Sequence, residues 1–287
     1  MSPDTKNQFR FKPVRARAGR KVTVITGIAL GIGALVTAFP FLWMITSSVK
    51  PQQESLTFPP SILPTHPTLQ YFKQLFTELD FGRYLTNTIA VVLIGFIGML
   101  FMAMAGYGFA KFEFLGKKMM FFLVLATMMI PIQVTMIPTY LILSQLKLTN
   151  TLIGIAIPTL VSGFNIFLFR QFMSTMPLEI LEAAKLDGAG EWRTFWQIVI
   201  PMSKPILAVQ AVLTFIAGWN SFLWPLIIAN DQNLYTLSVG LSLLNKQISV
   251  NPSLQMAAAS LMVVPILFVF VIFQRFIVQG FALSGLK

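Results

Sequence analysis

Residues 182–201 read EAAKLDGAGEWRTFWQIVIP, a polar and charged stretch set between long segments that carry no charge. The nearest uncharged segment before it ends at Phe169, and the next one begins at Pro205. The stretch is therefore a polar island in an apolar chain. The fold depends on which secondary structure these long uncharged segments form.

The chain as a whole is too apolar for a soluble domain. Of its 287 residues, 55% are hydrophobic and 11% charged, with a mean hydropathy of +0.74. A soluble domain carries about 25% charged residues, so this chain lacks the polar groups to cover a globular surface. We interpret it as an integral membrane protein. The absence of cysteine excludes disulfides and cysteine-ligated metals, and one histidine, His66, cannot build a metal site or a catalytic triad. We expect no cofactor.

Uncharged runs divide the rest of the chain, and each is long enough for a membrane-spanning helix of about 20 residues. The six runs are 22–49, 84–110, 119–146, 148–169, 205–230 and 254–274. We therefore expect an all-α integral membrane fold with six transmembrane helices. The first run is too long for a signal peptide and should be retained. Pro131 and Pro138 should kink the third run and shape a cavity there.

The basic residues predict the orientation. Six spans place both termini on one side, and that side holds sixteen of the 21 Lys and Arg residues. The positive-inside rule puts both termini and the island in the cytoplasm, below a bacterial or archaeal cytoplasmic membrane. Because these bases are spread over separate loops, they do not indicate nucleic-acid binding. The expected divisions are a basic arm (1–21), the first helix with its external loop (22–83), a core (84–275) containing the cytoplasmic loop 170–204, and a cytoplasmic tail (276–287).

The island itself predicts two helices joined at a glycine corner. Pro177 fits a helix start, and Gly188 fits the left-handed position that ends a helix. Glu182 and Lys185 are spaced to pair on its polar face. A second helix should cover 191–200 and lie on the membrane domain through an apolar stripe of Trp192, Phe195, Trp196 and Val199. On periodicity alone, an ordinary amphipathic connecting loop is the better explanation.

The identity of the island residues changes that balance. The run resembles the EAA motif of permease subunits in binding-protein-dependent ABC importers, which reads E-A-A, three residues, G, nine residues, I, one residue, L-P. The matching residues are Glu182, Ala183, Ala184, Gly188, Ile198 and Pro201. Ile200 stands where the family usually has Leu. The segments 105–117, 217–226 and 274–280 are also similar to carbohydrate permeases, so the resemblance covers about 84–287, on the shorter, six-span subunit of maltose-type transporters.

This resemblance implies a type I importer fold and a division of labour. Two permease subunits, here different chains, would form the pathway for a sugar, oligosaccharide or polyol. A cytoplasmic ATPase dimer would supply the force, and an extracytoplasmic binding protein would deliver the solute. The residues that would couple to the ATPase are Glu182, Ala183, Ala184, Asp187, Gly188, Ile198 and Pro201. The chain contains no G-x-x-x-x-G-K-[ST] phosphate loop, so we expect no enzymatic activity of its own.

The apolar runs contain no Asp, Glu, Lys, Arg or His, which argues against proton coupling and favours a neutral, hydroxyl-rich solute. Amide and indole groups suit sugars, so the candidate pathway residues are Gln133, Asn165, Trp219 and Asn220, with Trp224 a weaker candidate. Alternatively, these residues bond between helices or anchor at the membrane interface. For the whole chain, the alternatives are a stand-alone channel or secondary carrier, and a structural or sensory membrane subunit.

Overall fold

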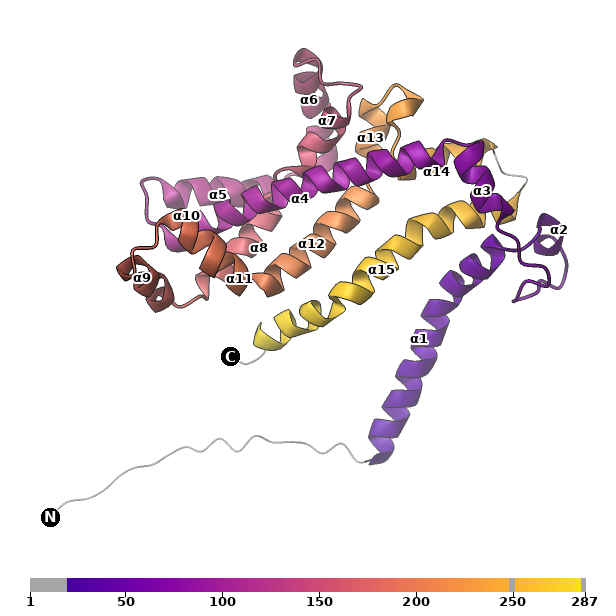
Figure 1. Ribbon diagram of the computed structural model, residues 1–287, viewed down its shortest axis with the longest axis horizontal. Coiled ribbons are helices and arrows are strands. Elements are labelled where there is room, and N and C mark those ends of the chain that lie inside the picture. The colour runs from indigo at the N-terminus through magenta and orange to yellow at the C-terminus, as the bar shows by residue number, and fades with distance from the viewer. Residues whose placement is uncertain (1–19, 248–250, 285–287) are drawn as a thin grey trace.

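The computed structural model describes residues 20–247 and 251–284, and within these ranges every regular element is a helix. Three helices are long and apolar enough to cross a membrane: α1 (Arg20–Ser48), α4 (Phe81–Lys111) and α15 (Pro252–Ser284). Figure 1 shows α4, α12 (Lys204–Trp219) and α15 running side by side, whereas α1 leans away and meets the start of α15. Residues 1–19 of the predicted basic arm (1–21) lie outside the described residues, and Arg20 and Lys21 begin α1.

Further candidate spans are helix pairs that bend at a short break. α5 (Lys117–Met128) and α6 (Ile132–Gln145) meet at 105°. The segment 152–159, made of α7 (Leu152–Ala156) and the 3-10 turn η1 (Ile157–Thr159), meets α8 (Gly163–Ser174) at 41°. The helical segment 191–202 meets α12 at 80°. Counting each bent pair as one span gives up to six candidate spans, the number that the sequence predicts, although the fifth begins at Glu191, inside the predicted loop 170–204.

The third apolar run departs from the kinked helix that we predicted. The chain breaks before Pro131, which stands at the N-terminal cap of α6 with φ −58°. Proline has no amide hydrogen and disfavours a helical conformation in the preceding residue, so Ile130 cannot continue α5 easily. Pro138, in contrast, lies inside α6, and the helix continues through it. Only the first of these two prolines separates two helices.

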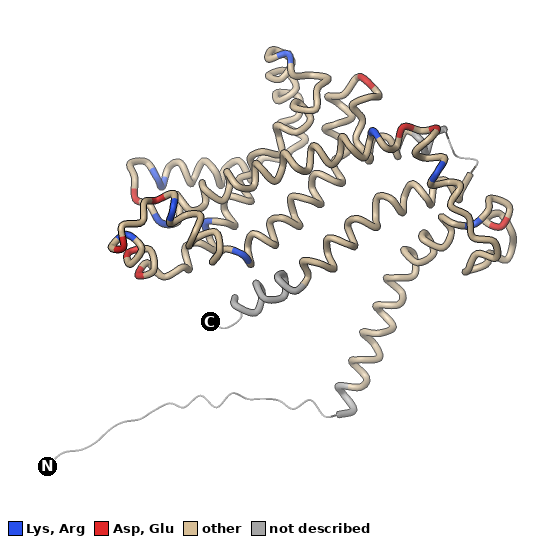
Figure 2. Tube along the Cα trace, in the orientation of Figure 1, with Lys and Arg blue, Asp and Glu red and all other residues tan. Residues whose placement is uncertain are grey.

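The shorter elements connect these spans. Figure 1 places α2, α3 and α14 at the end of the bundle opposite α9. Figure 2 shows that the charged residues gather towards the ends of the long helices and in the connecting segments, leaving the middle of these helices uncharged. The bounds of the connecting elements are α2 (Gln52–Ser55), α3 (Gln70–Thr77), α9 (Leu178–Leu186), α13 (Leu223–Ile228), η3 (Gln232–Leu234) and α14 (Leu237–Gln247).

The centre of the fold is the close contact between α4 and α8. A Cβ added at Gly106 would lie 2.4 Å from the Cβ of Phe169. Nearer the other end of α4, a Cβ at Gly98 would lie 2.5 Å from the Cα of Leu160. Such distances are shorter than real side chains allow, so α4 approaches its neighbours through glycine. Small residues that let backbones approach are typical of helix packing in membranes.

Candidate functional site

The EAA-like segment folds as an exposed helix, α9, that begins after Pro177. Its two faces differ: Leu181 and Ala184 are buried, whereas Glu182 and Ala183 are exposed. Ala183 has a small side chain on the exposed face, which leaves space for a partner to approach the helix backbone there. Of the first three motif residues, one therefore packs inward and two face outward.

The end of α9 confirms the prediction for Gly188, which has φ +77°. The Gly188 amide donates to the Lys185 carbonyl (3.0 Å), and the Ala189 amide donates to the Ala184 carbonyl (2.9 Å). This pair of bonds is the Schellman arrangement, which requires a left-handed residue at the Gly188 position. A Cβ added at Gly188 would meet nothing within 4 Å. The constraint on Gly188 is thus its backbone conformation and not the space around it.

The predicted pairing of Glu182 with Lys185 is wrong. The Lys185 ammonium instead contacts the Glu191 carboxylate at 2.8 Å. The turn after Gly188 brings the last turn of α9 against the first turn of α10 (Glu191–Thr194). A base near a helix C-terminus and an acid near a helix N-terminus both interact favourably with the helix dipoles. This exposed ion pair closes the corner and leaves Glu182 facing solvent.

The second helix is continuous over 191–202 but contains a π-helical turn, η2 (Phe195–Val199), before α11 (Ile200–Met202). Phe195 and Val199 are buried, as predicted. Trp192 and Trp196 are 67% and 46% exposed, so the stripe prediction is wrong for both tryptophans. The buried face includes Thr194 next to Phe195 and Val199, and it is therefore rotated away from the tryptophans.

The corner is joined to the membrane helices by one hydrophobic cluster. Leu181, Phe195 and Val199 belong to the same buried cluster as Tyr107 of α4 and Phe169 of α8. The rings of Tyr107 and Phe195 have centroids 5.6 Å apart. Ile198 is half-buried against this cluster, whereas Asp187 and Pro201 are exposed. The motif thus has an inner part that packs on α4 and α8 and an outer part that is open.

A cavity of about 410 Å³ lies among α4, α6, α8, α12 and α13. No Asp, Glu, Lys, Arg or His lines it within the described part of the chain. Thr214 lines the cavity, but its hydroxyl oxygen is buried and has no hydrogen-bond partner among the described residues. The other polar side chains in the wall are Thr135, Thr139, Thr159, Ser162, Asn165, Ser221 and Trp224.

The structure brings only one of the four candidate pathway residues to this cavity, namely Asn165. Gln210 donates to the backbone carbonyl of Asn165 (3.0 Å), a bond that leaves the Asn165 side chain uncommitted. Gln133 and Asn220 are exposed and do not line the cavity. Trp219 is buried between helices, where its indole N–H donates to the Met262 carbonyl (2.9 Å). For Trp219, the interhelical alternative describes the geometry.

The cavity residues that we did not single out from the sequence include Thr214 and Ser221. A signal for them exists in the sequence, because Gln210, Thr214 and Ser221 recur at helical spacing along the fifth apolar run. Trp224 lines the cavity as well, but its indole N–H is committed to the Gly154 carbonyl at 3.2 Å.

Comparison with known proteins agrees with this arrangement. A family model described as "Binding-protein-dependent transport system inner membrane component" matches residues 102–282. The chain is 34% identical over 93% of its length to the arabinooligosaccharides transport system permease protein AraQ of Halalkalibacterium halodurans, of which 99% is covered. It is 32% identical over 91% of its length to the diacetylchitobiose uptake system permease protein NgcG of Streptomyces coelicolor, of which 87% is covered. It is 31% identical, also over 91%, to the sn-glycerol-3-phosphate transport system permease protein UgpE of Yersinia enterocolitica, of which 96% is covered.

Solved structures show the same fold. A chain from a bacterial ABC transporter that imports the acidic polysaccharide alginate superposes with a TM-score of 0.80 at 23% identity, covering 93% of this chain and 100% of that one. A chain from the alginate transporter in complex with its alginate pentasaccharide-bound periplasmic protein gives 0.59 at 16% identity, covering 89% and 95%. The family match extends over more than half of the chain and includes both the α9 corner and most of the cavity-forming helices. The chain therefore belongs to the inner membrane components of binding-protein-dependent transport systems, the permease subunits of ABC importers.

Proposed function

We propose that this chain forms half of the membrane pathway of an ATP-driven importer for a sugar, oligosaccharide or related polyol. The observation that carries the proposal is the continuity between an exposed EAA-like helix and a cavity. The inner residues of the α9 corner pack into the same cluster as α4 and α8, and both of these helices contribute to the cavity wall. A force applied at α9 therefore has a packed route to the cavity.

The ATPase would be a separate cytoplasmic dimer that binds the open face of α9. Glu182, Ala183, Asp187 and Gly188 are all exposed on or just after this helix. In this proposal Ile198 and Pro201 shape the second helix of the corner, and Ala184 fixes α9 to the membrane domain. The sequence has no phosphate-binding loop, so ATP would be bound and hydrolysed on the partner.

The chemistry of the cavity supports an uncharged solute. The polar side chains in its wall carry hydroxyls, one amide and one indole, of which the indole N–H is committed to the Gly154 carbonyl. Sugar hydroxyls can satisfy such groups without an opposing charge. Among the relatives, AraQ and NgcG are named for neutral saccharides and UgpE for an anionic polyol phosphate. The described lining residues include no Lys or Arg, which favours the neutral class.

The remaining partners follow from the orientation. With both termini and α9 in the cytoplasm, the opposite end of the bundle would face an extracytoplasmic binding protein. A second permease subunit, which we infer to be a different chain, would complete the pathway, and lipid would cover the rest of the apolar surface. The proposed divisions of the chain are 1–21, 22–83, 84–275 and 276–287. Helix α15 extends beyond the third division, through the predicted tail to Ser284.

Replacement of Gly188 by valine tests the coupling role. A β-branched residue resists φ +77°, so Gly188→Val should open the corner and reduce ATP-dependent uptake at least tenfold while the chain still inserts in the membrane. Gly190→Val is the matched control, because Gly190 is extended (φ −70°, ψ 164°) and a Cβ there meets nothing within 4 Å. The measurement is uptake of labelled saccharide into cells carrying the whole transport system.

Normal uptake in the Gly188→Val variant would refute the coupling role. Uptake into vesicles that lack ATP and every partner would refute the importer assignment as a whole and support a channel or secondary carrier.

A further inference from the structure

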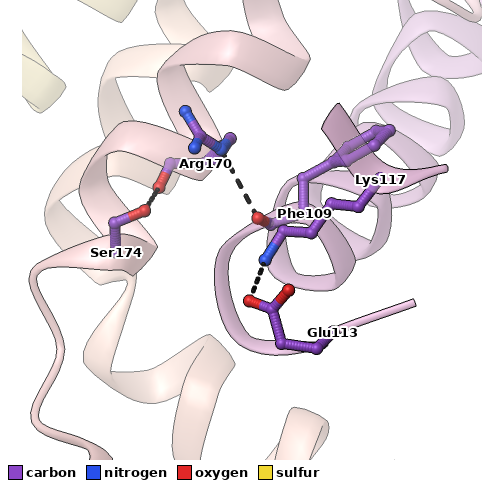
Figure 3. Close-up of polar contacts among 5 residues, drawn as sticks. All are labelled: Phe109, Glu113, Lys117, Arg170 and Ser174. Carbon is purple, nitrogen blue, oxygen red and sulfur yellow. Dashed lines mark hydrogen bonds and ion pairs between the residues drawn. The ribbon is translucent and has the colours of Figure 1, made fainter. Parts of the chain in front are cut away.

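Two basic side chains connect the ends of α4 and α8 near the coupling corner. The last carbonyls of any α-helix lack partners within the helix. Here the Arg170 Nε of α8 donates to the Phe109 carbonyl near the end of α4 at 3.4 Å, as Figure 3 shows. In the opposite direction, the Lys111 Nζ at the end of α4 donates to the carbonyl of Ser174, the last residue of α8 (3.5 Å), and to that of Met176 just after α8 (2.6 Å). Each helix thus supplies a cation to the other helix's end.

The arrangement also includes α5. The Arg170 guanidinium lies 4.0 Å from the ring centroid of Phe121, so one side chain contacts α4, α5 and its own helix. Figure 3 shows the Lys117–Glu113 ion pair (2.8 Å) that closes the turn between α4 and α5 beside it. Hydrogen bonds with a charged donor are about twice as strong as neutral ones. Of the bonds between α4 and α8, the one from Lys111 to the Met176 carbonyl (2.6 Å) has the short distance of this stronger class.

The position of the Lys111 bond matters most. Met176 directly precedes Pro177, after which α9 begins, so Lys111 holds the point at which the coupling helix leaves the membrane domain. The other parts of α4 and α8 reach the cavity through Val91, Gly95 and Asn165. Between these ends, the contact of Gly106 with Phe169 leaves no room for the two helices to approach more closely.

We propose that Lys111 and Arg170 form a reciprocal clamp that makes α4 and α8 a single rigid unit, so that a displacement of α9 moves two walls of the cavity together. Both are positioning residues, since neither lines the cavity or belongs to the EAA-like motif. The inference rests on the proposed function only for the assumption that an ATPase displaces α9. The clamp itself consists of contacts within this chain.

The test is a distance measurement within the chain, assembled with its own ATPase, second permease and binding protein in lipid nanodiscs. The chain has no native cysteine, so nitroxide labels can be attached at Glu179→Cys on α9 and Phe101→Cys on α4, both exposed. Double electron–electron resonance then reports the α9–α4 distance before and after trapping with ATP and vanadate. In the otherwise wild-type chain, we expect one narrow distance distribution that trapping does not change.

Lys111→Met should broaden this distribution. The fraction of molecules whose α9–α4 distance lies outside the wild-type range should rise about tenfold or more, the effect of losing a hydrogen bond to a charged group. Arg170→Met should do the same, and Lys111→Arg, which keeps a cation, should restore the narrow distance. Lys118→Met removes the same charge from an exposed neighbouring site and should match wild type. If Lys111→Met does not accumulate, Lys111→Gln keeps a donor but no charge and should give an intermediate broadening.

A narrow, unchanged distance in the Lys111 and Arg170 variants would overturn the clamp. Broadening in Lys118→Met equal to that in Lys111→Met would overturn it too, since any loss of charge would then suffice. Failure of the wild-type chain to associate with an ATPase would instead overturn the proposed function, and the intrachain distances would still decide on the clamp.

Discussion

α1 and α4 are both long apolar helices, yet they have opposite surroundings. In the most apolar window of α4, 44% of the residues are buried, and in that of α1 none are. Both helices contain glycines. Added Cβ atoms at Gly27 and Gly31 of α1 would meet nothing within 4 Å, whereas those at Gly98 and Gly106 of α4 would collide with neighbouring segments. Apolar composition therefore makes both helices candidates for a membrane span. Close packing through glycine is what buries α4, and not α1, among other helices.

The contrast has a functional side. α4 contacts the cavity, the corner and α8 along one continuous helix, so it cannot move without affecting all three. α1 packs mainly against α15, and most of its large side chains are exposed. We expect substitutions in α4 to alter the fold of the isolated chain and the equivalent ones in α1 to leave it nearly unchanged.

The largest difference should come from valine at glycine positions. Gly106→Val forces side-chain atoms against Phe169, where even the Cβ would lie at 2.4 Å, and should destabilise the chain by about 3 kcal/mol or more, at the upper end of overpacking. Gly31→Val adds the same atoms where nothing lies within 4 Å and should change stability by less than about 0.5 kcal/mol. Thermal unfolding of the purified chains in detergent measures both. Equal losses would show that α1 is packed as tightly as α4.

Truncation of large side chains should give the next largest difference. Met102 of α4 is 2% exposed, and its sulfur accepts a hydrogen bond from the Ser162 amide at 3.1 Å. Met102→Ala should cost about 2–5 kcal/mol, the usual range for deleting a buried side chain of this size. Leu35 of α1 is 70% exposed, so Leu35→Ala should be nearly neutral in the same unfolding assay. A strongly destabilised Leu35→Ala variant would contradict the exposed environment of α1.

The sequence predicted the features that depend on local chemistry. The uncharged runs located the long helices, because desolvation of charge in a bilayer acts on each segment separately. Gly188 was predicted as a left-handed helix end, because few other residues adopt that conformation without strain. The corner of α9 and the second helix was also predicted, from Pro177 at its start and the apolar residues of its buried face.

The features that the sequence did not predict depend on distant neighbours. Lys185 could reach either Glu182 or Glu191. It pairs with Glu191 because the turn after Gly188 folds the two helices together. Trp192 and Trp196 fit an apolar stripe, but the face that α4 and α8 cover is centred beside them. Pro131 and Pro138 have the same local chemistry, and only one of them separates two helices. Trp219 was assigned to the pathway by its type, whereas its indole N–H bonds to the Met262 carbonyl of α15.

The smallest difference concerns polar groups. Asn87 of α4 is 6% exposed, and its Nδ2 donates to the carbonyls of Asn233 and Tyr235 at 2.8 and 3.0 Å. Asn87→Leu should cost about 1–3 kcal/mol, because both carbonyls lose their donor. Among the residues that the structure describes, the Thr37 hydroxyl of α1 bonds only to carbonyls of its own helix, at Gly33 and Ala34, so Thr37→Val should stay within about 0.5 kcal/mol in the unfolding assay. If Thr37→Val cost as much as Asn87→Leu, the difference between the two helices would not extend to their polar groups. The expected result would show that α4 is held by directed bonds as well as by packing, which the proposed coupling between α9 and the cavity requires.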